Sequence, residues 1–300
     1  MATSTRVSGW GSSLGAPGVF PVATGIGRAL ARRQVALLGA AIVGTIGVLA
    51  IVGPLMAPYD PISQRLLDRL EPPSPAHWMG TDNLGRDIFS RLLFGARITL
   101  GVGFAAAAAA AVLGVAVGTA AGYYGGRLDN VLMRLVDLLL ALPSVLFALT
   151  IIAALGNSVP NLIVAIACAA IPTFARLSRG SALGVRTADY IEAARSVGAG
   201  DSRIMARHVL PNISAPLIVQ FTLQFSSAVL AASALSFLGL GVQPPTPEWG
   251  AMLSDARTVM QMAPHVAIFP GCAILLFVLA LNLLGDGLRD ALDPHLRSRR

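Results

Sequence analysis

The sequence contains no lysine, and only 12% of its 300 residues are charged. About a quarter of the residues of a soluble domain are charged, so this chain is not an ordinary soluble domain. All 22 basic residues are arginines, and their excess over 15 acidic residues gives a formal net charge of +7. Because the arginines alternate with apolar segments and form no continuous stripe, they favour membrane anchoring and argue against nucleic-acid binding.

Cysteine is equally scarce. Cys168 and Cys272 both lie inside apolar segments, which excludes a disulfide framework and a zinc-type cluster and favours small buried side chains. The chain also has no GxxxxGK[ST] loop, no HExxH and no GxSxG motif. We therefore assign no catalytic residue and no metal ligand. No apolar segment has a Lys, Glu or His at its centre, which argues against a stand-alone, ion-coupled secondary transporter.

Apolar sequence is abundant, since 55% of the residues are hydrophobic. A helix that crosses the hydrocarbon core needs about 20 mainly apolar residues, so the predicted fold is an all-α membrane protein with six transmembrane helices. The first apolar run begins only after residue 33, which indicates a retained span and not a cleaved signal peptide. The expected spans cover about 34–57, 98–124, 131–155, 159–178, 213–238 and 266–285.

The distribution of arginine predicts the orientation of these spans. Six spans place both termini on one side, and 16 of the 22 arginines then fall on that side, which we expect to be cytoplasmic. The outer loop, residues 60–97, is an exception because it holds five arginines. Residues 1–27 are rich in Ser, Gly and Pro and are expected to form a flexible cytoplasmic leader before a membrane domain at 28–300.

Three features of the spans and loops leave alternatives open. The small-residue face of Gly114, Gly118 and Gly122 indicates close helix packing, either within this chain or against a second membrane subunit. Asp137 is expected to pair with Arg134 or with the backbone, and less so to bind substrate. The end of the outer loop, 88–94, is either an interfacial helix or a dock for an external binding protein.

A polar island interrupts the apolar segments at Asp189–Asn212, within an expected cytoplasmic loop at 187–211. Asp189 and Glu192 form a capping-box pattern that predicts a helix from about Tyr190, and Gly198 is expected to end it. Asp201 is expected to cap a second short helix that ends at Leu210, before Pro211 turns the chain into the fifth span. Helices this short are marginal alone, so a groove on a partner is the expected binding place.

The island resembles the EAA loop of the membrane subunits of ABC importers. The stretch EAARSVGAGDSRIMARHVLPN supplies the shared Glu192, Ala193, Ala194, Gly198, Leu210 and Pro211. The family pattern has an apolar residue two positions before the Leu, where this chain has His208. The resemblance implies that the loop docks an ATPase through Asp189, Tyr190, Glu192, Ala193, Ala194, Arg195, Gly198, Asp201, Arg203, Arg207, His208, Leu210 and Pro211.

Two further motifs are similar to those of the C-type permease of dipeptide, oligopeptide and nickel importers. The first, GTDNLGRD, contains Gly80, Thr81, Asp82, Gly85, Arg86 and Asp87. The second, GDGLRD followed by Asp293-Pro294, contains Asp286, Arg289 and Asp290.

This resemblance implies a type I ABC importer permease in the bacterial inner membrane. The expected partners are a second, B-type permease in a heterodimer, two ATPase subunits, an external binding protein and membrane lipid. This chain itself would hold no cofactor, because ATP and Mg would bind the ATPases. Dipeptides or oligopeptides are the expected cargo, with nickel or another small solute as the alternative, and no substrate-binding residue is assigned. An exporter permease would lack the EAA loop.

Overall fold

The computed structural model describes residues 34–292, so the expected leader at 1–27 and the Asp293-Pro294 pair lie outside the described residues. Over 34–292 the named elements are all helical. The long helices are α2 (Gln34–Met56), α3 (Ile88–Tyr124), α6 (Val159–Val185), α9 (Leu210–Phe237) and α11 (His265–Leu292). The short elements are η1 (Leu66–Asp68), α4 (Gly126–Leu140), α5 (Ser144–Leu155), α7 (Asp189–Ser196), α8 (Asp201–Ile204), the π-helical η2 (Met205–Val209) and α10 (Trp249–Ala256).

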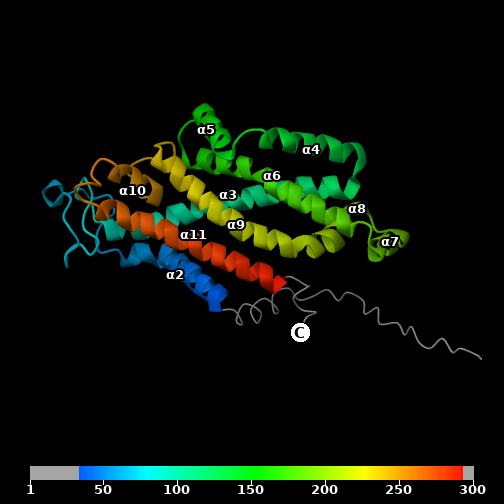
Figure 1. Cartoon of the computed structure of the whole chain (residues 1–300), viewed down its shortest axis with the longest axis horizontal. Coiled ribbons are helices and arrows are strands. Elements are labelled where there is room, and N and C mark those ends of the chain that lie inside the picture. The colour runs from blue at the N-terminus through cyan, green and yellow to red at the C-terminus, as the bar shows by residue number, and fades with distance from the viewer. Residues whose placement is uncertain (1–33, 293–300) are drawn as a thin grey trace, which may run out of the picture.

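The long helices run side by side along the long axis of the molecule, which gives the bundle two distinct ends (Figure 1). One end, which we call the outer end, carries the loop at 57–87 and α10; the other, the inner end, carries α7 and α8 (Figure 1). Within residues 34–292, five helices are long and apolar enough to cross a membrane. At 1.5 Å per residue the 37-residue α3 is about 55 Å long, so it extends beyond a hydrocarbon core of about 30 Å.

The third expected span, 131–155, is not one helix. It consists of α4 and α5, which are bent by 88° at a short break, and six crossings are reached only if this pair counts as one. Pro143 lies in the break, where it lacks an N–H donor and disfavours helical geometry at Leu142. The sequence reads as continuous there because a proline at the start of a helix leaves the apolar pattern unchanged.

Two ion pairs fasten α4 to α6. Arg179 binds Asp129 through two hydrogen bonds of 2.5 and 2.6 Å, and Arg176 binds Asp137 at 2.7 Å. The expected pairing of the Asp137 side chain with Arg134 or the backbone is therefore wrong, because α6 brings a different arginine alongside.

The glycine face packs within this chain. A methyl group on Gly118 would collide with the carbonyl oxygen of Ala175 and the hydroxyl of Ser178 on α6. A methyl group on Gly114 would come within 2.6 Å of the Cβ of Phe174. The small residues thus allow the backbones of α3 and α6 to approach closely, and the alternative of a face reserved for a second subunit is not supported.

Two loop and cysteine expectations need correction. The segment 88–94 is not a separate interfacial helix, because Asp87 caps α3 and Ile88 is completely buried. The helix that forms the second span therefore begins ten residues earlier than expected. Of the two cysteines, Cys168 is half-buried and Cys272 is exposed, so the expectation that both are buried is wrong. Cys272 lies on α11, where an exposed apolar side chain suits a membrane-facing surface.

Candidate functional site

The polar island forms the tip of the inner end, with α7 as its first element (Figure 1). The residue at the N-cap position of α7 is Ala188, whose backbone is extended and whose side chain makes no capping bond. The expected capping box of Asp189 and Glu192 is therefore not formed, since Asp189 is already inside the helix. Both carboxylates lie in the first turn, where they complement the partial positive charge of a helix start.

Gly198 ends α7 as predicted. Its backbone adopts a left-handed conformation with φ of +82°, and its N–H donates to the carbonyl of Arg195 at 2.9 Å. The next N–H, of Ala199, donates to the carbonyl of Ala194 at 3.0 Å. This closing pattern satisfies carbonyl groups that a helix end leaves without partners, and glycine is the residue that adopts it without strain.

The second short helix does not stand alone. Residues Asp201–Phe237 form one continuous helix, in which α8 passes through the π-helical η2 into α9. The N–H of Leu210 donates to the carbonyl of Met205 within this wider turn. The wider turn accommodates Pro211, which has no N–H of its own. The island is therefore one free helix, α7, and the inner extension of the fifth span.

Asp201 has a different role from the one expected. The N-cap of α8 is Gly200, and the Asp201 carboxylate instead accepts a hydrogen bond of 2.7 Å from the hydroxyl of Tyr123, at the end of α3. The guanidinium of Arg195 lies over the same tyrosine ring, 5.3 Å from its centre. Tyr123 thus contacts both sides of the Gly198–Gly200 elbow, which no motif in the sequence indicates.

Apolar packing holds the buried side of α7. Ile191 is completely buried, in a cluster with Ile204, Val209, Tyr123 and Ile213. Ile191 lies between the charged residues Asp189 and Glu192, and helical periodicity is the signal that identifies it as buried. Partial burial also raises the pKa of the nearby Tyr190 phenol.

Most of the remaining residues of the island are exposed. Val197, which was not among the predicted docking residues, is 85% exposed beside the elbow. The expected docking residues that are partly buried are Tyr190, Ala194 and His208. Those that are exposed are Asp189, Glu192, Ala193, Arg195, Gly198, Asp201, Arg203, Arg207, Leu210 and Pro211.

The GTDNLGRD motif lies at the opposite, outer end and builds a buried clamp. The Asp82 carboxylate binds the side chain of Arg86 at 2.6 Å, and Arg86 binds Asp255 of α10 at 2.9 Å. Arg91 contacts both carboxylates, at 3.4 and 3.6 Å. Burying these charges is tolerable because each has a partner. The clamp therefore joins the outer loop, α3 and α10.

The remaining residues of this motif fix the backbone of the loop. Gly80 and Gly85 have φ of +76° and +71°, and a Cβ on either would collide with a carbonyl oxygen. The Thr81 hydroxyl donates to the carbonyl of Asp68 and accepts from the N–H of Glu71. Asp87 accepts from the N–H of Ser90 at 2.8 Å and thereby caps α3.

Glu248 is a further buried acid at the outer end, and no motif in the sequence indicates it. Its carboxylate caps α10 by accepting from the N–H groups of Gly250 and Ala251 at 3.0 and 2.8 Å. The hydroxyl of Thr99 on α3 also donates to it, at 3.1 Å. Burial raises the pKa of Glu248, and the two backbone donors partly offset that effect.

The third motif lies on the inner part of α11. Asp286 and Arg289 are exposed and Asp290 is half-buried. This helix packs against α2 and α9, so the three motifs do not form one site. The EAA loop and the GDGLRD motif lie toward the inner end of the bundle, and the GTDNLGRD motif lies at the outer end.

Comparisons with known proteins place the chain among transport proteins. Residues 114–298 match the family model "Binding-protein-dependent transport system inner membrane component", and residues 25–73 match "N-terminal TM domain of oligopeptide transport permease C". The chain is 48% identical over 272 residues to a glutathione transport system permease protein of Pectobacterium atrosepticum, covering 90% of each chain. It is 46% identical over 269 residues to a dipeptide transport system permease protein of Alkalihalophilus pseudofirmus, covering 90% of this chain and 88% of that protein.

Proposed function

Since the chain belongs to the family of binding-protein-dependent transport system inner membrane components, we propose that it is the translocation subunit of an ATP-driven importer of short peptides. It is a multi-pass inner-membrane protein with a role in translocation and not in catalysis. The cargo is a dipeptide or a similarly short peptide, because the named relatives transport dipeptides and glutathione, which is itself a short peptide. This favours a peptide over nickel.

The observation that carries the proposal is the construction of the inner tip. A short helix, α7, is anchored on its apolar side through Ile191 and leaves Glu192, Ala193 and Val197 exposed. Small and mixed side chains on a fixed helix suit insertion into a groove of a partner. The partners are two ATPase subunits, which hold the ATP and Mg, together with a B-type permease and an external binding protein.

The inner end faces the cytoplasm in this proposal. It carries the exposed Arg195, Arg203, Arg207 and Arg289, as the positive-inside rule requires. The first described residue of α2 and the last of α11 both lie toward this end (Figure 1), which supports the proposed cytoplasmic location of both termini. The outer end, with its clamped loop, then faces the binding protein.

Charge reversal on α7 tests the proposal. Glu192→Arg reverses an exposed charge on α7. Gly198→Asp adds a side chain at a left-handed helix end, which strains the backbone there. Both variants are expected to insert normally, lose copurification of the ATPases and lose uptake of dialanine. Arg127→Glu is the matched control, because it reverses an exposed charge on α4, which contributes no residue to the apolar cluster that anchors α7. Normal uptake and ATPase copurification in both α7 variants would refute the assignment.

A further inference from the structure

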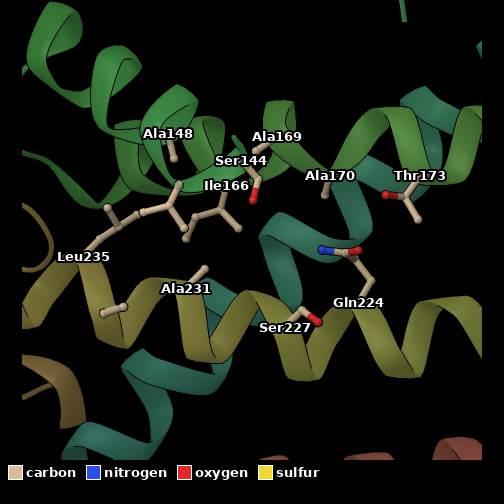
Figure 2. A pocket seen from close by; sticks show the side chains of 12 residues that line it. Ser144, Ala148, Ile166, Ala169, Ala170, Thr173, Gln224, Ser227, Ala231 and Leu235 are labelled. Carbon is tan, nitrogen blue, oxygen red and sulfur yellow. The ribbon is translucent and has the colours of Figure 1, made fainter. Parts of the chain in front are cut away.

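A cavity of about 240 Å³ lies between α5, α6 and α9 (Figure 2). Its volume equals that of about eight water molecules at about 30 Å³ each. Two of its polar residues lie near the midpoints of their helices: Thr173 is the fifteenth of 27 residues in α6, and Gln224 is the fifteenth of 28 in α9. The cavity therefore lies within the membrane-spanning part of the bundle.

The polar side chains of this cavity have spare hydrogen-bonding capacity. Gln224, Thr173 and Ser144 line the cavity, and within residues 34–292 their side chains form no hydrogen bond. A helical threonine can satisfy its hydroxyl on the carbonyl four residues earlier, as Thr150 does with Leu146 at 2.9 Å. Thr173 does not. Since an unsatisfied polar group in hydrocarbon costs several kcal/mol, this face is not built to contact lipid tails.

The polar groups face one another across the cavity. Figure 2 shows the amide of Gln224 extending from α9 toward Ala170 and Thr173 of α6, with Ser227 on the same helix and Ser144 opposite. Thr173 and Ser227 are exposed, so one side of the cavity is open. A guest that enters there meets hydrogen-bond donors and acceptors on two sides.

The cavity is electrically neutral, which restricts its ligand. None of its lining residues is charged, and the nearest exposed charges on α6 and α4 are those of Arg176 and Asp137, which neutralise each other at 2.7 Å. A nickel ion prefers imidazole, thiolate or carboxylate ligands, and the lining supplies none of these. A carboxamide and hydroxyl groups both donate and accept, which matches the N–H and C=O groups of a peptide main chain.

We propose that this cavity binds the main-chain amide groups of a short peptide during translocation, through Gln224, Thr173 and Ser144. The Ser227 hydroxyl also lines the cavity, but it already donates to the carbonyl of Leu223 at 3.0 Å and is left only as an acceptor. The inference rests on the proposed function and specifies where in this chain the cargo is held. Recognition of the main chain is independent of the side chains of the peptide. Such a cavity passes peptides of different sequence, while the alanines of α6 and α9 around it leave room for their side chains.

Nearly isosteric variants in the assembled transporter test the proposal. Gln224→Leu and Thr173→Val keep the volume and remove the hydrogen-bonding groups, and each is expected to lower dialanine uptake about tenfold, as the loss of one such bond predicts. Thr150→Val is the control, since that hydroxyl is already satisfied within α5. Copurification of the ATPases is expected to remain normal in all three.

Labelling of a cysteine provides a direct readout of occupancy. Replacing Cys168 and Cys272 by alanine removes every native cysteine, after which Ser227→Cys or Thr150→Cys is introduced. Dialanine, supplied with binding protein and ATP, is expected to slow maleimide labelling at position 227 and not at 150. An analogue of dialanine with a methylated amide nitrogen is expected to protect less.

Two results would overturn the cavity assignment. One is wild-type uptake by both cavity variants, with no effect of dialanine on labelling. The other is a position 227 that stays unreactive in the assembled transporter without peptide, which would show that the face packs against the second permease. If the wild-type transporter takes up neither dialanine nor glutathione, the proposed function itself fails, and this outcome is distinct from the other two.

Discussion

Removal of one hydroxyl group at the inner tip, in Tyr123→Phe, tests how α7 is held. The Tyr123 hydroxyl donates to Asp201 at 2.7 Å, across 78 positions of sequence. Hydrogen bonds to charged groups contribute about 1.5–3 kcal/mol, but Asp201 is exposed to solvent, so about 1 kcal/mol is the expected loss. The ring remains, so its contact with Arg195 and its packing on Ile191 are retained.

A loss of about 1 kcal/mol raises the population of the detached tip about fivefold, since 1.36 kcal/mol corresponds to a factor of ten. Amide hydrogen exchange reports that population directly. In the purified protein, we expect the amides of 189–200 to exchange about fivefold faster in the variant, with the rates of α3 and α6 unchanged. Asp201→Asn retains an acceptor and is expected to produce a smaller effect.

Tyr124→Phe is the control, because Tyr124 is the exposed neighbour and its hydroxyl has no partner within residues 34–292. The reasoning is refuted if exchange at 189–200 is unchanged in Tyr123→Phe. It is equally refuted if Tyr124→Phe accelerates exchange by the same factor, because the effect would then come from the neighbouring rings of Tyr123 and Tyr124, whose centres lie 5.2 Å apart, and not from the bond to Asp201.

Gly118 on the glycine face of α3 and the buried Glu248 allow two further predictions. Gly118→Val is expected to destabilise the bundle by about 1–3 kcal/mol or more through overpacking against α6, whereas Gly101→Val, with open space around it, should leave thermal stability unchanged. Burial raises the folded-state pKa of Glu248, so its stabilisation is complete below its unfolded pKa of about 4.3 and is lost as the pH rises through the folded pKa. The melting temperature of the wild type minus that of Glu248→Gln should therefore decrease from pH 4 to pH 8, and an increase of this difference with pH would contradict the sign.

Several parts of this structure could be predicted from local patterns. Apolar runs of about 20 residues identified the membrane helices, and Gly198 identified the end of α7, because both signals are properties of one segment. The first and last residues of the helices were harder to predict from the sequence. α3 begins at Ile88 because Asp87 caps it, and Arg91, the first charged residue that follows, is buried in a clamp that only the folded chain forms.

The contacts that hold the candidate site together are long-range, and a single sequence does not reveal them. Tyr123 and Asp201 are ordinary residues in separate segments, and neither belongs to a motif that predicts their bond. The same holds for Arg176 and Asp137, where the nearer Arg134 was the natural partner on sequence grounds. Capping was misplaced by one position at Asp189 and Asp201, since extended geometry of the preceding residue decides where a helix begins.

The continuous helix Asp201–Phe237 gives the proposed importer a direct mechanical connection. Its inner end lies beside α7, its outer half carries Gln224 and Ser227 in the cavity, and its outer end packs against α10. Because the helix is continuous from the inner tip to the cavity, we expect a displacement that a bound ATPase imposes on the tip to shift the cavity wall as well. A second short helix that ended at Leu210, as the sequence predicted, would instead have left a turn at Pro211 between the inner tip and the fifth span.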